Sequence, residues 1–208
     1  FTDNPDLQLA LIDALEQEEH ATVKAEILRT LSATTRGATG THEMYTDRLS
    51  GNPLEVRVAA LEALQAYPNV DRVIQRVQRY ALVSENTEMR KTALQTYRHL
   101  ASPQQFQSVV KRIVNESDNF AYLIPTILDN LYSPPDTVTD SGRQLAESLS
   151  QRFIDRDYPY PIRSRGMQAL IEHDTLSKNW RERIPELLKD PDPRIRYMAI
   201  PALDNTAH

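Results

Sequence analysis

The sequence of 208 residues contains no cysteine and only five glycines. Without cysteine, the chain has no disulfide bonds, no thiolate zinc sites and no cysteine nucleophile. So few glycines leave few residues for the positive-φ turns of β-hairpins, whereas thirteen prolines suit frequent helix starts and stops. The sequence has no run of about 18 apolar residues that could span a bilayer. We therefore expect a soluble helical protein, cytoplasmic or periplasmic, and we expect this chain, which begins at Phe1, to be a segment of a longer one.

An excess of positive charge is also absent. The net charge is −5 and the isoelectric point is near 5.6, which disfavours a protein whose main task is to bind a phosphate backbone. The charge is uneven, however, because residues 1–31 carry seven acidic and two basic side chains, whereas residues 71–112 carry eight basic and three acidic ones. This asymmetry indicates either electrostatic selection of a partner or simply solvated helix faces.

A nine-residue signature recurs along the chain. It has an aliphatic residue first, usually a basic residue second, and apolar or small residues at the fifth, eighth and ninth positions. The copies are VKAEILRTL from 23, VRVAALEAL from 56, MRKTALQTY from 89, IRSRGMQAL from 162 and IRYMAIPAL from 195, with three steps of 33 residues. FAYLIPTIL from 120 is a degenerate copy, and the remaining excess length falls in the insertion LYSPPDTVTD at 131–140. Equal steps predict a structural repeat.

Each copy places its apolar residues on one face of an α-helix, and a second helical pattern precedes each copy. Prolines and asparagines separate the patterns, as expected at helix boundaries. We predict six antiparallel helix pairs, with small residues such as Ala60, Ala93 and Gly166 where helices approach most closely. The expected ranges are 7–17 with 21–33, 41–50 with 55–66, 70–83 with 87–100, 103–115 with 119–132, 141–154 with 161–173, and 179–189 with 194–204.

The period and the pattern V-R-x-x-A-x-x-A-L in VRVAALEAL and IRYMAIPAL resemble HEAT repeats, in particular the short bacterial kind. The resemblance covers nearly the whole chain, 1–208. It implies one all-α domain, a right-handed α-solenoid of about six helix pairs, in which the second helix of each pair lines the concave side. Proteins of this family are mostly binding scaffolds, and a few are enzymes.

The most regular polar feature is the basic residue at the second signature position. It is found as Lys24, Arg57, Arg90, Arg163 and Arg196. Two interpretations are open: a charged ladder for an anionic partner, or structural cations that bind carbonyls or an acidic side chain of a neighbouring repeat. Since repeated polar positions usually serve the interfaces between repeats, we favour the structural interpretation.

Catalytic and metal sites have little support in the sequence. Some HEAT-like enzymes resembling deoxyhypusine hydroxylase hold two irons with several His-Glu dipeptides, but only His42-Glu43 has that form here. Others excise alkylated bases from DNA through a basic channel, which the net charge disfavours, and Trp180 opens a first helix and so faces away from the concave side. We therefore expect no enzymatic activity, no metal and no cofactor, with such an enzyme, acting on nucleic acid or on a chromophore-bearing protein, as the alternative.

The third and seventh signature positions, and the residue three further on, point away from the apolar face of the second helix. These positions predict a polar groove with scattered apolar spots, a surface suited to a protein or peptide, where Arg and Tyr are frequent anchors. We therefore expect a protein-interaction scaffold; a structural spacer is a further alternative. The predicted protein-binding residues are Arg29, Glu62, Lys91, Gln95, Arg98, Gln168 and Tyr197.

Overall fold

A computed structural model describes residues 5–35, 40–116, 120–132, 139–172 and 178–204. This described part is all-helical, with twelve α-helices, two short 3₁₀ helices and no strand. None of these helices combines the length and the apolar character that crossing a membrane requires. The chain divides into two compact units, residues 1–117 and 118–208, and each unit is described by itself.

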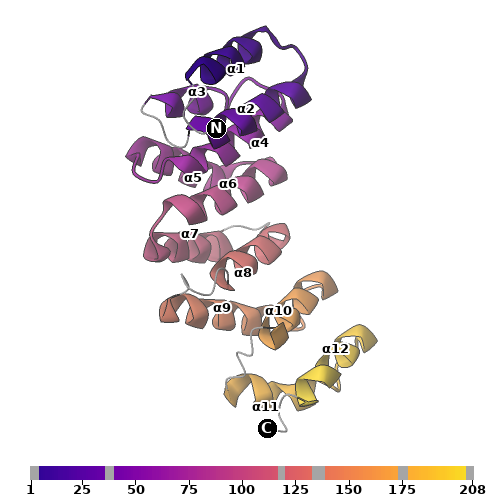
Figure 1. Cartoon of the computed structure of the whole chain (residues 1–208). Coiled ribbons are helices and arrows are strands. Elements are labelled where there is room, and N and C mark those ends of the chain that lie inside the picture. The colour runs from indigo at the N-terminus through magenta and orange to yellow at the C-terminus, as the bar shows by residue number, and fades with distance from the viewer. Residues whose placement is uncertain (1–4, 36–39, 117–119, 133–138, 173–177, 205–208) are drawn as a thin grey trace. The chain divides into compact units, whose positions relative to one another are not determined.

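Five of the six predicted helix pairs pack together within one unit, three in the first unit and two in the second (Figure 1). The remaining predicted pair, 103–115 with 119–132, is divided between the two units. The first unit contains α1 (Pro5–Gln17), α2 (Ala21–Thr35), α3 (Thr41–Asp47), α4 (Leu54–Ala63), η1 (Leu64–Ala66), α5 (Asp71–Val83), α6 (Thr87–Leu100) and α7 (Pro103–Glu116). The second unit contains η2 (Ala121–Leu123), α8 (Ile124–Tyr132), α9 (Asp140–Phe153), α10 (Tyr160–Glu172), α11 (Lys178–Leu187) and α12 (Pro193–Asp204).

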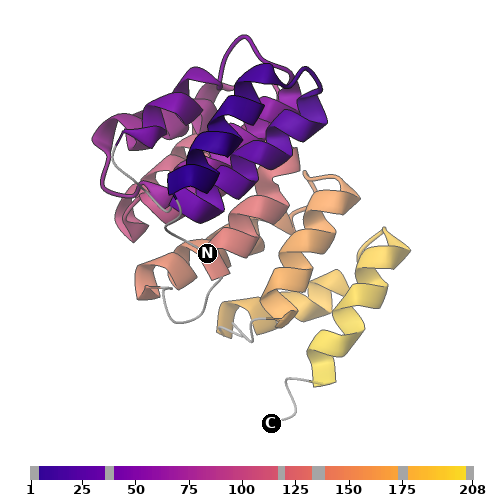
Figure 2. The ribbon, with the colours of Figure 1, turned by 45° about the horizontal axis from the view of Figure 1, so that its top comes forward.

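Within the first unit the second helices α2, α4 and α6 pack side by side, and α5 packs on α6 and on α7 (Figure 2). Each inner second helix is therefore covered on both flanks. The fourth and sixth signature positions are buried for this reason, although the apolar pattern predicts burial only at the first, fifth, eighth and ninth: Leu61 and Leu94 at the sixth are 0% exposed. Thr96 at the eighth position of α6 is also buried, and its hydroxyl donates to Leu61 O at 3.1 Å, which fixes α6 against α4.

The fourth copy of the signature starts three residues later than predicted. In α6 the third and seventh positions, Lys91 and Gln95, are exposed, and the matching exposed pair in α8 is Pro125 and Asp129. This correspondence places the first position at Leu123. The start at Phe120 is wrong because residues 121–123 form the 3₁₀ turn η2, and the Phe120 ring packs against Phe153 instead, with ring centroids 6.2 Å apart.

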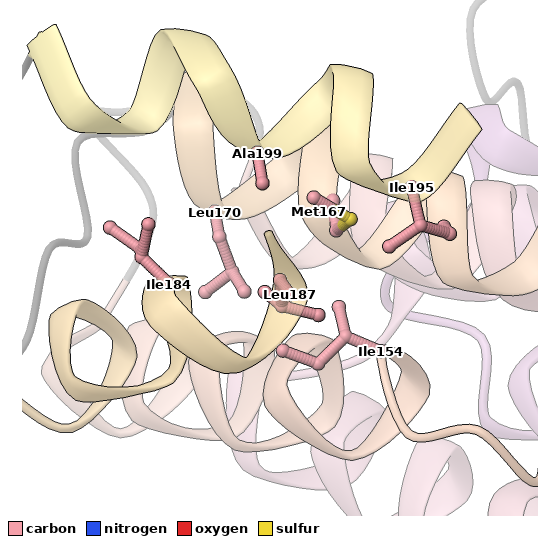
Figure 3. Packing of buried hydrophobic residues seen from close by; sticks show 7 residues of the cluster. All are labelled: Ile154, Met167, Leu170, Ile184, Leu187, Ile195 and Ala199. Carbon is pink, nitrogen blue, oxygen red and sulfur yellow. The ribbon is translucent and has the colours of Figure 1, made fainter. Parts of the chain in front are cut away.

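The core of the second unit joins three helices and the turn after α9 (Figure 3). Met167 and Leu170 of α10 face Ile195 and Ala199 of α12. Residues of α11 and of the turn after α9 make up the rest of the cluster. All members are at most 2% exposed; the remaining ones are Ile154, Ile184 and Leu187. Burial of such side chains stabilises each by about 1.5–3 kcal/mol, so this cluster is what fixes the last pair onto α10.

Gly166 permits the close approach of α9 and α10, as the sequence predicts. A Cβ atom at this position would lie 2.9 Å from the main-chain oxygen of Ser150 and 3.2 Å from Cβ of Phe153. Both contacts are closer than ordinary van der Waals distance, and one of them is to backbone that cannot rotate away. The two helices therefore pack at a spacing that only glycine allows.

We predict that Gly166→Ala destabilises the second unit by about 1–3 kcal/mol, because the added methyl group overpacks the helix interface. In an exposed helix the same substitution would stabilise by about 1 kcal/mol, so the sign of the effect tests the packing. Urea unfolding followed by circular dichroism measures it. Gln168→Ala, on the exposed face of the same helix, is the control and should change stability little; a Gly166→Ala variant as stable as the native chain would contradict the packing.

Candidate functional site

Arginines at the second signature position cross from the second helix of a pair to the end of the first helix or to the turn that follows it. Nε of Arg57 donates to Leu49 O, Nε of Arg90 to Ala81 O, and Nε of Arg163 to Ile154 O, each at 3.0 Å. In the last pair Nη1 of Arg196 donates to Asp190 O at 2.7 Å. The last carbonyls of a helix have no partner within it and form the negative end of its dipole. The structural interpretation is thus confirmed for these four arginines, with the bonds made inside a pair.

Arg163 makes a further interaction that extends to the next pair. Its two Nη atoms donate to the carboxylate oxygens of Asp190 at 3.1 and 2.5 Å, and both side chains are buried. The backbone N–H of Asp192 also donates to Asp190, and Arg156 lies 3.6 Å away. Mainly because of the hydrogen bonds from Arg163, the pKa of Asp190 lies below its usual range. A pKa below that of the unfolded chain means that ionised Asp190 stabilises the folded state.

We predict that Asp190→Asn destabilises the second unit by about 3 kcal/mol, since it leaves the Arg163 guanidinium buried without its counter-charge. Stabilisation by Asp190 is present above the carboxyl pKa of the unfolded chain, near 4, and is lost as the pH falls through the lower pKa of the folded state. Below pH 4 the stability of the native chain should therefore decline towards that of the variant. Urea unfolding between pH 2 and pH 7 measures the difference.

The control is Asp129→Asn, which removes a carboxylate that pairs with Arg165 but lies on the surface of α8. Exposed pairs contribute about 0–1 kcal/mol, so this variant should stay close to the native chain across the same pH range. An equal loss of unfolding free energy in the two variants would contradict the claim that the buried pair of Asp190 with Arg163 contributes more than an exposed pair.

The predicted protein-binding residues of the first unit lie on the row formed by α2, α4 and α6. Nε of Arg29 on α2 donates to Glu62 on α4 at 2.8 Å, so adjacent helices bring these two seventh positions together. Lys91 and Gln95 on α6 are exposed. Arg98 is half-buried, with its guanidinium 5.6 Å from the centre of the Phe106 ring on α7. Arg98 therefore also contributes to packing.

The two remaining predicted residues belong to the second unit. Gln168 on α10 is exposed and donates to Glu172 of the same helix at 2.5 Å. Tyr197 on α12 is 75% exposed, together with Ile200 at 52% and Leu203 at 42%. Because Tyr197 lies in a different unit from Lys91, Gln95 and Arg98, its grouping with them stays a prediction.

Two residues of the first copy lie differently from the prediction. Ala25, expected in the groove, is 1% exposed, whereas Val23, expected in the core, is 44% exposed. Ala25 is small enough to be covered when α2 packs against its neighbours α1 and α4, and the described residues leave Val23 uncovered. The polar row on α2 consequently begins at Arg29.

A basic pocket in the first unit was not predicted from the sequence. It has a volume of about 600 Å³ and lies where the end of α5 meets the starts of α4 and α6. Arg57 comes from α4, and Arg76 and Arg79 come from the exposed side of α5. Two features of the sequence point to a basic site here: the excess of basic residues in 71–112 and the i, i+3 spacing of Arg76 and Arg79. Placing Arg57 beside them requires the packing of α4 on the α5–α6 pair.

Among the described residues, no group of three or more His, Asp or Glu side chains is arranged to hold a metal ion. Most of the insertion predicted at 131–140 and the side chain of Trp180 lie outside the described residues. No protein-family model, curated protein or solved structure matches the chain.

Proposed function

We propose that this chain is a HEAT-type repeat protein, a right-handed α-solenoid, and that it binds a protein or peptide without catalysing a reaction. The proposal rests on the 33-residue period, on the helix pairs and on second helices that pack side by side in each unit. In such stacks each second helix is held by its neighbours, so its outward side is free to vary. That outward side forms the binding surface.

The observation that carries the proposal is the exposed polar row on α2, α4 and α6. Arg29 and Glu62 neutralise each other in an ion pair, and Lys91 and Gln95 continue the row on α6. Lys91 has no ion-pair partner among the described residues. A rigid surface with alternating charge and amide groups suits an extended peptide or a helix that offers a carboxylate to Lys91 and hydrogen-bonding groups to Gln95.

The energetics favour a partner of moderate affinity. Exposed charge pairs contribute little to affinity but raise the rate of association and set the orientation of the partner. A rigid row costs little conformational entropy on binding because its helices are already fixed by buried contacts such as the bond from Thr96 to Leu61. A binding module of this kind needs no cavity and no acid-base group on the row.

We predict that a photo-crosslinking amino acid placed at Lys91 or Gln95 captures a partner in cells of the source organism. The same amino acid at Lys111, on the exposed side of the first helix α7, should capture none, because that side does not belong to the row. Capture at position 91 should also be lost when Gln95→Glu adds a negative charge beside the site and repels an acidic partner.

The crosslinked species are identified by mass spectrometry, and the variants are first checked for native unfolding behaviour. The same species captured from positions 91, 95 and 111 would contradict the proposed surface, because it would show non-specific labelling of every face. Capture from position 111 alone would move the binding surface to the first helices.

A further inference from the structure

The pocket that contains Arg57, Arg76 and Arg79 occupies the same place in its repeat as the buried ion pair of the second unit. Asp190 precedes the first signature residue of α12, Ile195, by five positions, and Ser84 precedes the first signature residue of α6, Met89, by five positions. Arg163 and Arg57 are both second-position arginines, and both donate from Nε to the end of the first helix of their own pair. The two sites therefore differ in one decisive residue: a carboxylate in one and a hydroxyl in the other.

The second unit shows which group a second-position arginine binds. There, both Nη atoms of Arg163 donate to the carboxylate of Asp190 from the next pair. In the described part of the first unit no carboxylate reaches the Nη atoms of Arg57, and Ser84 lines a cavity of about 600 Å³ instead. The Nε bond to Leu49 O still fixes the side chain of Arg57, so its outer N–H groups are oriented before any ligand arrives.

Two further arginines make the cavity more basic than the site around Asp190. Arg76 and Arg79 line it from one side of α5, and neither has an ion-pair partner among the described residues. Glu85 is the one acidic side chain among the lining residues that the structure describes, against three guanidinium groups. Three guanidinium groups against one carboxylate leave a net positive charge, so the pocket gains stability from an anion that carries about two negative charges.

We propose that this pocket binds the phosphate monoester of a phosphorylated peptide, with the phosphate in the place that the Asp190 carboxylate takes in the second unit. The planar guanidinium groups of Arg57, Arg76 and Arg79 match phosphate oxygens in pairs. Asn86 also lines the pocket; its side-chain oxygen accepts from Met89 N, and its amide N–H groups can donate to a phosphate oxygen. The volume leaves room for the residues that flank the phosphorylated one. A peptide is favoured over nucleic acid because the chain as a whole carries −5 and the arginines gather in one pocket.

The pocket and the polar row on α2, α4 and α6 are built from different residues, so this inference does not depend on the proposed function. Loss of partner capture from the row would leave phosphate binding in the pocket intact. Conversely, failure of the pocket to bind phosphate would leave the row untouched.

The test is a titration of the full chain with a short N-acetylated phosphoserine peptide, followed by NMR signals of arginine Nε–H groups. We expect the signals of Arg57, Arg76 and Arg79 to shift together. The same peptide with unmodified serine, inorganic phosphate and a single-stranded oligonucleotide are titrated in parallel. Inorganic phosphate that binds as tightly as the phosphopeptide would overturn the assignment to a peptide, and an oligonucleotide that binds more tightly would replace it with nucleic acid.

Ser84→Asp is the decisive variant because it installs the carboxylate that the second unit already has. We expect it to raise the melting temperature and to weaken phosphopeptide binding about tenfold or more, since the new side chain occupies the Nη atoms of Arg57. Arg76→Gln with Arg79→Gln should weaken binding to a similar extent without lowering the melting temperature.

Arg72→Gln is the matched control, an exposed arginine on the same helix that does not line the pocket. It should bind the phosphopeptide as the native chain does. Binding that is unchanged in Ser84→Asp and in the Arg76→Gln, Arg79→Gln double variant would overturn the proposal.

Discussion

In four of the six pairs, a second-position arginine donates a hydrogen bond to a carbonyl at the end of the preceding helix or in the turn after it, and this interaction holds the two helices together. The first helices are short, at most 14 residues, so their unpaired carbonyl groups make up a large share of their backbone. Arg90 and Arg163 are buried where they donate to these carbonyls. A buried carbonyl without a donor costs about 1–3 kcal/mol. The guanidinium group removes this cost and places a positive charge at the negative end of the helix dipole.

The same arginine also connects stability and binding. Arg163 gives one N–H from each of its two Nη atoms to Asp190, so its charge is paired inside the fold. Arg57 stands at the same signature position, but Ser84 takes the sequence position of Asp190, and Arg76 and Arg79 add positive charge to the pocket. One structural device can therefore close a repeat interface in one copy and leave a pocket for an anion in another. The two copies can differ in this way because the residues around the core pattern are free to change while the core pattern is kept.

Periodicity predicts most of this fold because burial along a helix repeats with the chain. Five of the six pairs, the close approach at Gly166 and the structural role of Arg57, Arg90, Arg163 and Arg196 were predictable from the signature. The start of the fourth copy was not, because Phe120 imitates a first-position residue while its ring belongs to the contact with Phe153. The burial of Leu61 and Leu94 at the sixth position depends on neighbouring helices on both flanks, which a single-helix pattern does not contain. The pocket was missed for a related reason, since it depends on the side chains of two pairs.

The exchange of arginine Nε protons with water, measured by NMR on the full chain, tests the central claim most directly. If the second-position arginines bind the ends of the first helices, the Nε protons of Arg57, Arg90 and Arg163 exchange much more slowly than those of Arg72 and Arg79, which are exposed on α5. Exchange of all five at similar rates would show that these bonds do not persist in solution and would contradict the account.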